Sequence, residues 1–242
     1  LLTGLFYTPA GGFRFRARAA EPGAETVLGI SYGDDGDPDL ADIDAVLEDL
    51  ARHPSTARHL ARKLVVHFVS DSPDPALVDH VAAGYSASGG LLLGAYEALL
   101  DHPASWVQER HKVKPPLDFI QSAVRALDPP ETAVLSEDSR TVRRHFLNPM
   151  RQMGLDWERP TGPAGWPEEP TAWATPQGVA ARIGWALQIP GRLREPLPDP
   201  RDFVEVALGP DIPEEVRFAA SAAEDRRSGI ALILASPAFQ RR

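Results

Sequence analysis

Hydrophobic residues recur at helical spacing through most of the chain from Asp39 onward. They fall three or four positions apart, which places their side chains on one face of an α-helix. The rows are Ile43, Val46, Leu47 and Leu50; Leu60, Leu64 and Phe68; Leu117, Ile120, Val124 and Leu127; and Val179, Ile183 and Leu187. We expect each row to face the core of a mainly α, multi-helix globular body.

The first thirty residues follow a different pattern. Phe13 and Phe15 alternate with Arg14 and Arg16, which gives one apolar and one charged face at the two-residue period of a β-strand. Residues 5–16 therefore predict two short strands joined at Gly11-Gly12, and residues 26–29 could add a third. We expect a short N-terminal β-hairpin or meander within residues 1–30.

Polar residues followed by proline mark several expected helix starts. The polar side chain can accept from free N–H groups, and proline fits the first helical position because its missing N–H has no intrahelical partner there. The pairs are Asp74-Pro75, Thr175-Pro176, Asp199-Pro200 and Ser236-Pro237. Several of the 24 prolines are thus interpreted as helix punctuation.

The stretch from Trp157 to Ala174 is the expected non-helical insert. It holds Trp157, Trp166 and Trp173 among four prolines. A flexible linker would be poor in aromatic residues, so we predict an ordered Trp/Pro-rich loop attached to the body. No strong domain boundary is visible, and residues 1–242 are expected to form a single helical domain.

Composition narrows the classes of function. The 242 residues carry a formal net charge of −9, which disfavours a nucleic-acid partner because such proteins present basic patches. Cysteine is absent, which excludes disulfides and thiolate chemistry. The longest apolar runs are too short for a membrane span. The chain begins Leu-Leu-Thr-Gly, which is interpreted as a start inside a longer protein.

His59, Lys63 and His67 recur every four residues and form a stripe beside an apolar helix face. The two histidines lie about 12 Å apart along the helix axis, too far to share one metal ion. The stripe therefore predicts a rim that pairs with acids or binds an anion. Lys63 is a binding candidate, with a structural ion pair as the favoured alternative.

Lys112 and Lys114 lie just before a helix expected to begin near Pro115 or Pro116. Cations at a helix N-terminus oppose the helix dipole, while the free N–H groups there attract anions. Each lysine should therefore contact something negative. An internal carboxylate is the favoured partner, and a bound anion is the alternative.

Residues 34–39, Asp-Asp-Gly-Asp-Pro-Asp, could offer oxygen ligands to calcium, chiefly from Asp35, Asp37 and Asp39. The EF-hand pattern fails, because Leu40 stands where glycine is needed. A solvated turn before a helix is the favoured interpretation. No stretch carries a convincing ligand set, so we predict no metal site and no cofactor, and no established hydrolase, Walker or dinucleotide motif is present.

One pattern is specific enough to indicate a family. Residues 50–69 follow Leu-x-x-His-Pro-x-Thr-Ala and continue to Lys63-Leu64 and Phe68-Val69. Together with residues 112–127, Gly165-Trp166-Pro167 followed by Arg182, and residues 232–240, this pattern resembles the bacterial family known as domain of unknown function 1800. The chain is similar to the C-terminal half of that family's usual length.

The resemblance implies an exported, mainly helical protein, periplasmic or extracellular, with a partner from a second envelope family encoded nearby. It implies no reaction. Trp166 and Arg182 join the binding candidates through the matched Trp-Pro loop and the helix after it. Our first hypothesis is a cell-envelope binding or assembly module without catalysis. The alternative is a hydrolase of an envelope polymer or ester, with paired carboxylates in a cleft beside Trp166.

Overall fold

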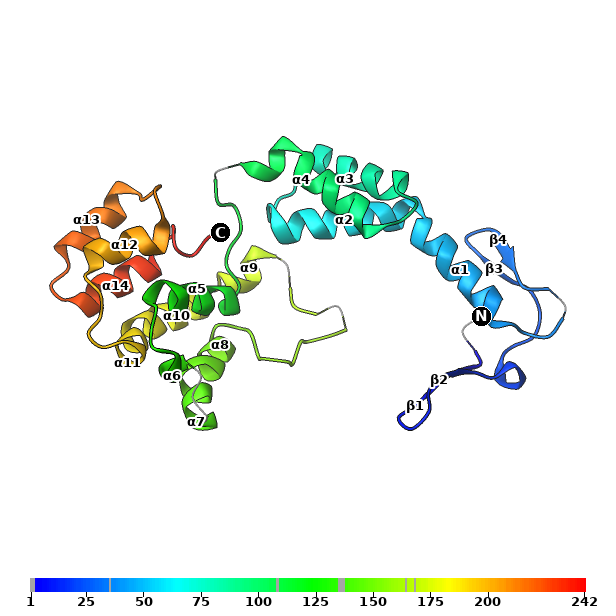
Figure 1. The fold of residues 1–242 in the computed structure, drawn as a ribbon, viewed down its shortest axis with the longest axis horizontal. Coiled ribbons are helices and arrows are strands. Elements are labelled where there is room, and N and C mark those ends of the chain that lie inside the picture. The colour runs from blue at the N-terminus through cyan, green and yellow to red at the C-terminus, as the bar shows by residue number, and fades with distance from the viewer. Residues whose placement is uncertain (1–2, 35, 108, 135–137, 164, 168) are drawn as a thin grey trace. The chain divides into compact units, whose positions relative to one another are not determined.

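The computed structural model describes residues 3–34, 36–107, 109–134, 138–163, 165–167 and 169–242 (Figure 1). The fold is mainly α with short β-hairpins near the N-terminus, which confirms the expected class. Contacts divide the chain into two compact units. The first unit holds Leu1–Val65 and Pro73–Ser105, and the second unit holds Val66–Ser72 and Trp106–Arg242. Each unit is described by itself, and the single domain expected from the sequence stays a prediction.

Two separate β-hairpins lead the first unit. Strand β1 (Leu5–Thr8) pairs antiparallel with β2 (Gly12–Phe15), as the alternating pattern predicted. The expected third strand does not extend this sheet. It is β3 (Glu25–Val27), which pairs with β4 (Ile30–Tyr32) in a second two-stranded sheet. Of the two expected alternatives, the hairpin is therefore confirmed, and a second hairpin follows it in place of a meander.

Four α-helices complete the first unit, of which α2 continues past its boundary at Val65. They are α1 (Leu40–Arg52), α2 (Pro54–Phe68), α3 (Pro75–Ala87) and α4 (Leu92–Asp101), with short 3₁₀ turns at Ala17–Ala19 and Pro103–Trp106. Helices α3 and α4 approach closely at Gly84 and Gly94: a Cβ atom on Gly84 would lie 2.7 Å from the Gly94 carbonyl oxygen. The Tyr85 hydroxyl donates to the Ala51 carbonyl at the end of α1, at 2.8 Å. These contacts leave little freedom between the helices of this unit.

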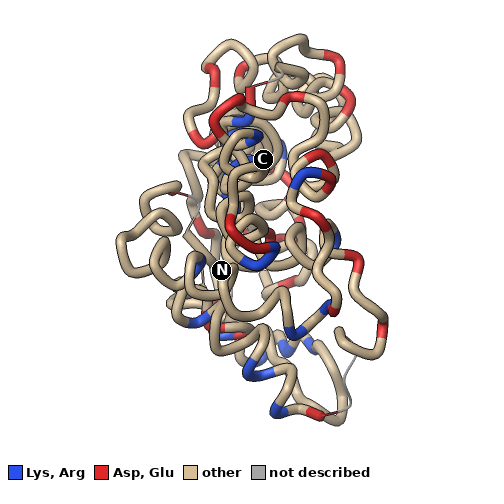
Figure 2. The backbone as a smooth tube through the Cα atoms, turned by 90° about the vertical axis from the view of Figure 1, so that its left-hand side faces the viewer, with Lys and Arg blue, Asp and Glu red and all other residues tan. Residues whose placement is uncertain are grey.

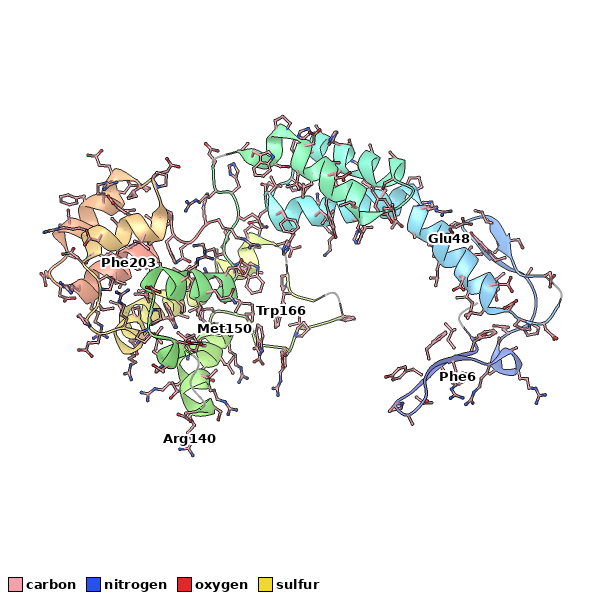
Figure 3. The ribbon with its side chains drawn as sticks, in the orientation of Figure 1. Phe6, Glu48, Arg140, Met150, Trp166 and Phe203 are labelled. Atoms are coloured by element: carbon pink, nitrogen blue, oxygen red, sulfur yellow. The ribbon has the colours of Figure 1, made fainter. Side chains whose placement is uncertain are left out.

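The second unit is built from shorter helices around one apolar core. They are α5 (Pro116–Leu127), α6 (Glu131–Val134), α7 (Ser139–Val142), α8 (Asn148–Gln152), α9 (Pro170–Trp173), α10 (Pro176–Gln188), α11 (Pro190–Leu193), α12 (Pro200–Leu208), α13 (Glu214–Ala222) and α14 (Arg226–Ala235). A π-helical turn, Arg143–Leu147, joins α7 to α8. Phe119 of α5 meets the rings of Trp185 and Phe239 edge-on, at centroid distances of 5.6 and 5.9 Å. Phe203, labelled in Figure 3, is buried in the same core.

Three of the predicted core rows differ from the structure. In α1, Ile43 and Val46 are buried as expected, but Leu47 and Leu50 are exposed. In α2, Phe68 is 63% exposed, and the buried line is Ala57, Ala61 and Val65. In α10, the row Val179, Ile183 and Leu187 is exposed, while the buried side chains include Arg182 and Trp185. In α2 and α10 the larger aliphatic side chains flank the buried line because smaller or amphipathic residues fill the closest contacts.

Three of the four expected helix starts are present. Asp74, Thr175 and Asp199 each accept a backbone N–H from the first turn of α3, α10 and α12, respectively. Ser236-Pro237 starts no helix. Instead, the Ser236 hydroxyl accepts from the Phe239 N–H at 3.2 Å and closes a single turn after α14.

The stretch expected to be non-helical, residues 157–174, ends in the short helix α9, Pro170–Trp173, and this end attaches the loop to the second unit. Trp173 is 4% exposed, and its Nε1–H donates to the Pro167 carbonyl at 3.1 Å. Trp166, labelled in Figure 3, is partly buried against the core. Trp157 is 45% exposed. Two of the three tryptophans thus hold the loop in place.

Charged residues and helix lengths follow the sequence expectations. Figure 2 shows that acidic and basic residues are dispersed along the backbone instead of being gathered in one segment. Among the residues that the structure describes, no helix is both long enough and apolar enough to cross a lipid bilayer.

Candidate functional site

The Lys112–Lys114 segment pairs with the C-terminal residues of the chain. Lys112 and Arg242 exchange two backbone hydrogen bonds, of 3.2 and 2.9 Å, and the Lys114 N–H donates to the Gln240 carbonyl at 2.9 Å. Val113 and Arg241 form the antiparallel bridge between them. The two lysines are therefore held in an extended segment immediately before α5.

Lys112 has the internal carboxylate partner that its position predicted. Its Nζ donates to Asp71 Oδ1 at 2.5 Å and to the Val66 carbonyl, and Asp71 Oδ2 accepts the Val113 N–H at 3.1 Å. The Lys112 and Asp71 side chains are only 8% and 7% exposed. The charged atoms of this buried pair bond to each other and to backbone groups. The pair therefore has a structural role and leaves no free group for a ligand.

Lys114 has a different environment. It is 8% exposed, and its Nζ lies 3.8 Å from the centroid of the Phe239 ring. Among the described residues, no carboxylate comes within ion-pair distance of this ammonium group. Burial, aided by the charges of Arg110, Arg182 and Arg242, lowers the pKa of Lys114 to about 8, although Asp118 acts in the opposite direction.

Arg182 of α10 lies beneath this segment and is 1% exposed. Its Nη1 donates to Gln240 Oε1 at 2.7 Å, and its Nη2 donates to the Lys114 carbonyl at 2.8 Å. The guanidinium carbon lies 5.2 Å from the centroid of the Phe119 ring. Burial lowers the pKa of Arg182 to about 10. Arg182 thus links three segments of the second unit from inside the core.

Within the second unit, the structure brings Lys114 and Arg182 together, with Lys112 two positions away along the chain. Trp166 packs against the core of the same unit. Lys63 lies exposed on α2 in the first unit.

A groove that the sequence did not indicate lies between α8 and α10. Its volume is about 430 Å³. The π-helical turn supplies Arg144, and α11 supplies Arg192. The remaining lining residues are Asn148, Pro149, Gln152, Ala180, Ala181, Gly184, Trp185, Gln188 and Ile189. Such π-helical segments occur frequently at functional sites.

The groove is cationic. Arg144 and Arg192 line it together with three side-chain amides, and none of the described lining residues is acidic. Within the described chain, neither arginine forms an ion pair. The neighbouring His145 has a buried Nδ1 without a hydrogen-bond partner. Burial first, and then the charges of Arg192 and Arg144, lowers the pKa of His145, which keeps its imidazole neutral near pH 7.

Two features fix the shape of the groove. The Trp185 Nε1–H donates to the His145 carbonyl at 2.9 Å and so ties α10 to the π-helical turn. At Gly184, an added Cβ atom would meet only Gln188 Nε2, at 4.0 Å. The space above Gly184 is therefore open, and a ligand can approach the α10 backbone there.

The acidic loop of the first unit has the geometry of a helix-capping turn. Asp34 Oδ1 accepts the Gly36 N–H at 2.7 Å, and Asp39 Oδ1 accepts the Ala41 N–H at the start of α1, at 3.2 Å. Asp35 lies outside the described residues. Within the described part of the chain, no group of three potential metal-ligating side chains occurs.

The fold and the groove define a mainly helical protein with a cationic, polar-lined concave surface. The chain belongs to the family described as protein of unknown function (DUF1800), whose sequence profile matches residues 1–241. Comparisons with curated proteins and with solved structures found no match. The profile match shows the family of the chain, and the groove is the structural basis for a proposed function.

Proposed function

We propose that this chain is a binding module of the cell envelope, without catalysis, that holds an acidic group of its ligand in the groove between α8 and α10. The observation that carries this proposal is the charge of the lining. Arg144 and Arg192 face the groove without an ion-pair partner among the described residues, in a chain whose formal net charge is −9. A local excess of positive charge on an acidic protein attracts an acidic ligand group selectively.

The chemistry of the lining matches carboxylates and phosphates. The planar guanidinium group presents paired N–H donors that fit both groups in a bidentate manner. The side-chain amides of Asn148, Gln152 and Gln188 add donors that do not depend on pH. The open space at Gly184 lets an acidic group approach between them.

The proposal includes export of the protein and a partner protein in the envelope, both of which the family resemblance implies. A module that recognises acidic groups suits the envelope, whose polymers and proteins expose carboxylates and phosphates. The hydrolase alternative called for two carboxylates across a cleft beside Trp166. The described lining of the groove offers cations and side-chain amides and has no carboxylate, which supports binding over hydrolysis at this groove.

Isothermal titration calorimetry with citrate and with inorganic phosphate tests the proposal. We expect the wild-type chain to bind at least one of these probes. Replacing both arginines, R144Q with R192Q, should weaken binding at least about tenfold, because each lost charge-assisted hydrogen bond contributes about 1.5–3 kcal/mol. The matched control is R151Q, since Arg151 is an exposed arginine on α8 that does not line the groove.

A second variant separates binding from folding. Gly184→Leu should fill the groove and abolish binding of the probes, while the helix itself gains about 0.5–1 kcal/mol because leucine is a better helix former than glycine. Absence of citrate and phosphate binding by the wild type at millimolar concentration would contradict the proposal. Unchanged binding by Gly184→Leu would show that the probes bind elsewhere.

A further inference from the structure

The second unit buries two cations without a carboxylate partner. Lys114 and Arg182 are 8% and 1% exposed. The Arg182 Nε–H is buried and has no hydrogen-bond acceptor among the described residues. The Lys114 ammonium has no hydrogen-bond acceptor among the described residues either, and its Nζ lies over the face of the Phe239 ring.

The two side chains share one environment. Arg182 donates to the backbone carbonyl of Lys114, at 2.8 Å. Lys114 stacks on Phe239 and Arg182 on Phe119, and these two rings are in edge-on contact with each other. The two positive charges therefore lie around a single pair of aromatic rings.

The charges around Lys114 are mixed, with cations in excess. Asp118, in the first turn of α5, favours the Lys114 charge, but its carboxylate is already engaged by Arg242 at 2.6 Å. Pro115, at the N-cap of α5, has no side-chain acceptor. The free N–H groups in the first turn of α5 are therefore not capped by a side chain. The charges of Arg110 and Arg242 reach Lys114 as well and contribute to its low pKa.

Burying a charge without a partner is costly, and proteins compensate buried charges by pairing them. We propose that Lys114, Arg182 and the N-terminus of α5 form a binding site for a small monovalent anion of the halide class, chloride in the first place. Such an ion supplies the missing acceptor for Arg182 Nε and the missing counter-charge for Lys114.

Burial limits the proposed ligand to a small one, because Lys114 and Arg182 are packed among core residues. Neither side chain lines the groove between α8 and α10 or the other described cavities. A buried water could accept from Arg182 Nε, but it would leave the charge of Lys114 uncompensated. The anion site is also separate from the groove proposed for the acidic ligand.

Thermal unfolding of the chain in potassium chloride and in potassium methanesulfonate, at equal ionic strength and pH 7, tests the site. We expect chloride to raise Tm by about 5–10 °C when it exceeds its Kd a hundredfold, and the bulky methanesulfonate to have no such effect. Lys114→Met should remove the chloride response. It should also raise Tm in chloride-free buffer, because it removes an uncompensated charge.

The matched control is R151M, which removes an exposed cation from α8 outside the groove and should keep the full chloride response. Equal Tm values in both salts for the wild type would overturn the inference. A response that persists in Lys114→Met, or that disappears in R151M, would overturn it too. If Lys114→Met fails to fold, bromide-soaked crystals of the wild type decide: anomalous density beside Lys114 Nζ and Arg182 Nε supports the site, and its absence there contradicts it.

Discussion

Lys112 and Lys114 show how far two equal side chains, two positions apart, can differ once they are buried. Asp71 balances the Lys112 charge. Lys112 also donates to the Val66 carbonyl, and Asp71 also accepts the Val113 N–H. The Lys114 charge meets an aromatic face and an excess of cations, which the charge of Asp118 offsets only in part. Removing the first charge leaves a buried carboxylate unpaired, whereas removing the second relieves repulsion. The two substitutions to methionine should therefore change stability in opposite directions.

Lys112→Met should lower the free energy of unfolding by about 3–5 kcal/mol, because the buried Asp71 carboxylate is left without its partner. Urea unfolding followed by circular dichroism measures this loss. The double variant with Asp71→Asn should recover most of it, since the unpaired charge is gone. Lys63→Met, at an exposed position on α2, is the control and should cost less than about 1 kcal/mol. A loss of that small size for Lys112→Met would refute the buried pair.

Lys114 should make stability depend on pH above neutrality. Its pKa in the folded chain, about 8, lies below the ordinary lysine value of 10.5. Between these values the unfolded chain binds more protons than the folded chain, so stability should rise as pH increases from about 8 to 10.5. Urea unfolding in chloride-free buffer should show this rise for the wild type relative to Lys114→Met. Parallel curves for the two proteins would mean that Lys114 titrates normally.

At the scale of elements, the α3–α4 contact depends on two glycines. A Cβ atom on Gly84 would lie 2.6 Å from the Ala98 Cβ and 2.7 Å from the Gly94 carbonyl oxygen. Gly84→Ala should therefore destabilise the first unit by about 1–3 kcal/mol, as overpacking does. Gly184→Ala, in the open part of α10, is the matched control and should stabilise by about 0.5–1 kcal/mol. Differential scanning calorimetry of both variants would test the contrast, and equal shifts would refute it.

The sequence predicted helices better than it predicted their faces. Capping pairs such as Asp74-Pro75 act locally, so three of the four marked a helix start correctly. The face of α2 was misplaced because Ala57 and Ala61, which carry a weak hydrophobic signal, make the closest contacts. The Lys112 partner was expected as a carboxylate, but nothing in the pattern identified Asp71.

The groove could not be predicted because its parts are far apart in the sequence and follow no motif. Arg144 and Arg192 lie on different helices, and the π-helical turn that presents Arg144 has no compositional signature. Only the packing of α10 against α8 brings the two arginines to one surface. The spacing of the arginines along the chain does not indicate which of them meet in the fold.

At the scale of the whole molecule, we expect stability to be independent of metal ions. The described residues contain no group of three metal-ligating side chains, and Asp34 and Asp39 accept backbone N–H groups within their own turn. Treatment with EDTA should leave Tm within about 1 °C of its untreated value, because no bound ion is linked to folding. A clear drop in Tm that calcium restores would contradict this and would implicate Asp35, Asp37 and Asp39.

The pairing of Lys112–Lys114 with Gln240–Arg242 has a consequence for synthesis on the ribosome. The lysine segment is translated long before Gln240–Arg242. Its backbone and the Arg182 guanidinium therefore lack these hydrogen-bond partners until Arg242 has left the exit tunnel. During that interval the second unit lacks this pairing and is accessible to chaperones and proteases. A nascent chain arrested before Gln240 should therefore be digested by a protease much faster than one arrested with Arg242 well outside the tunnel.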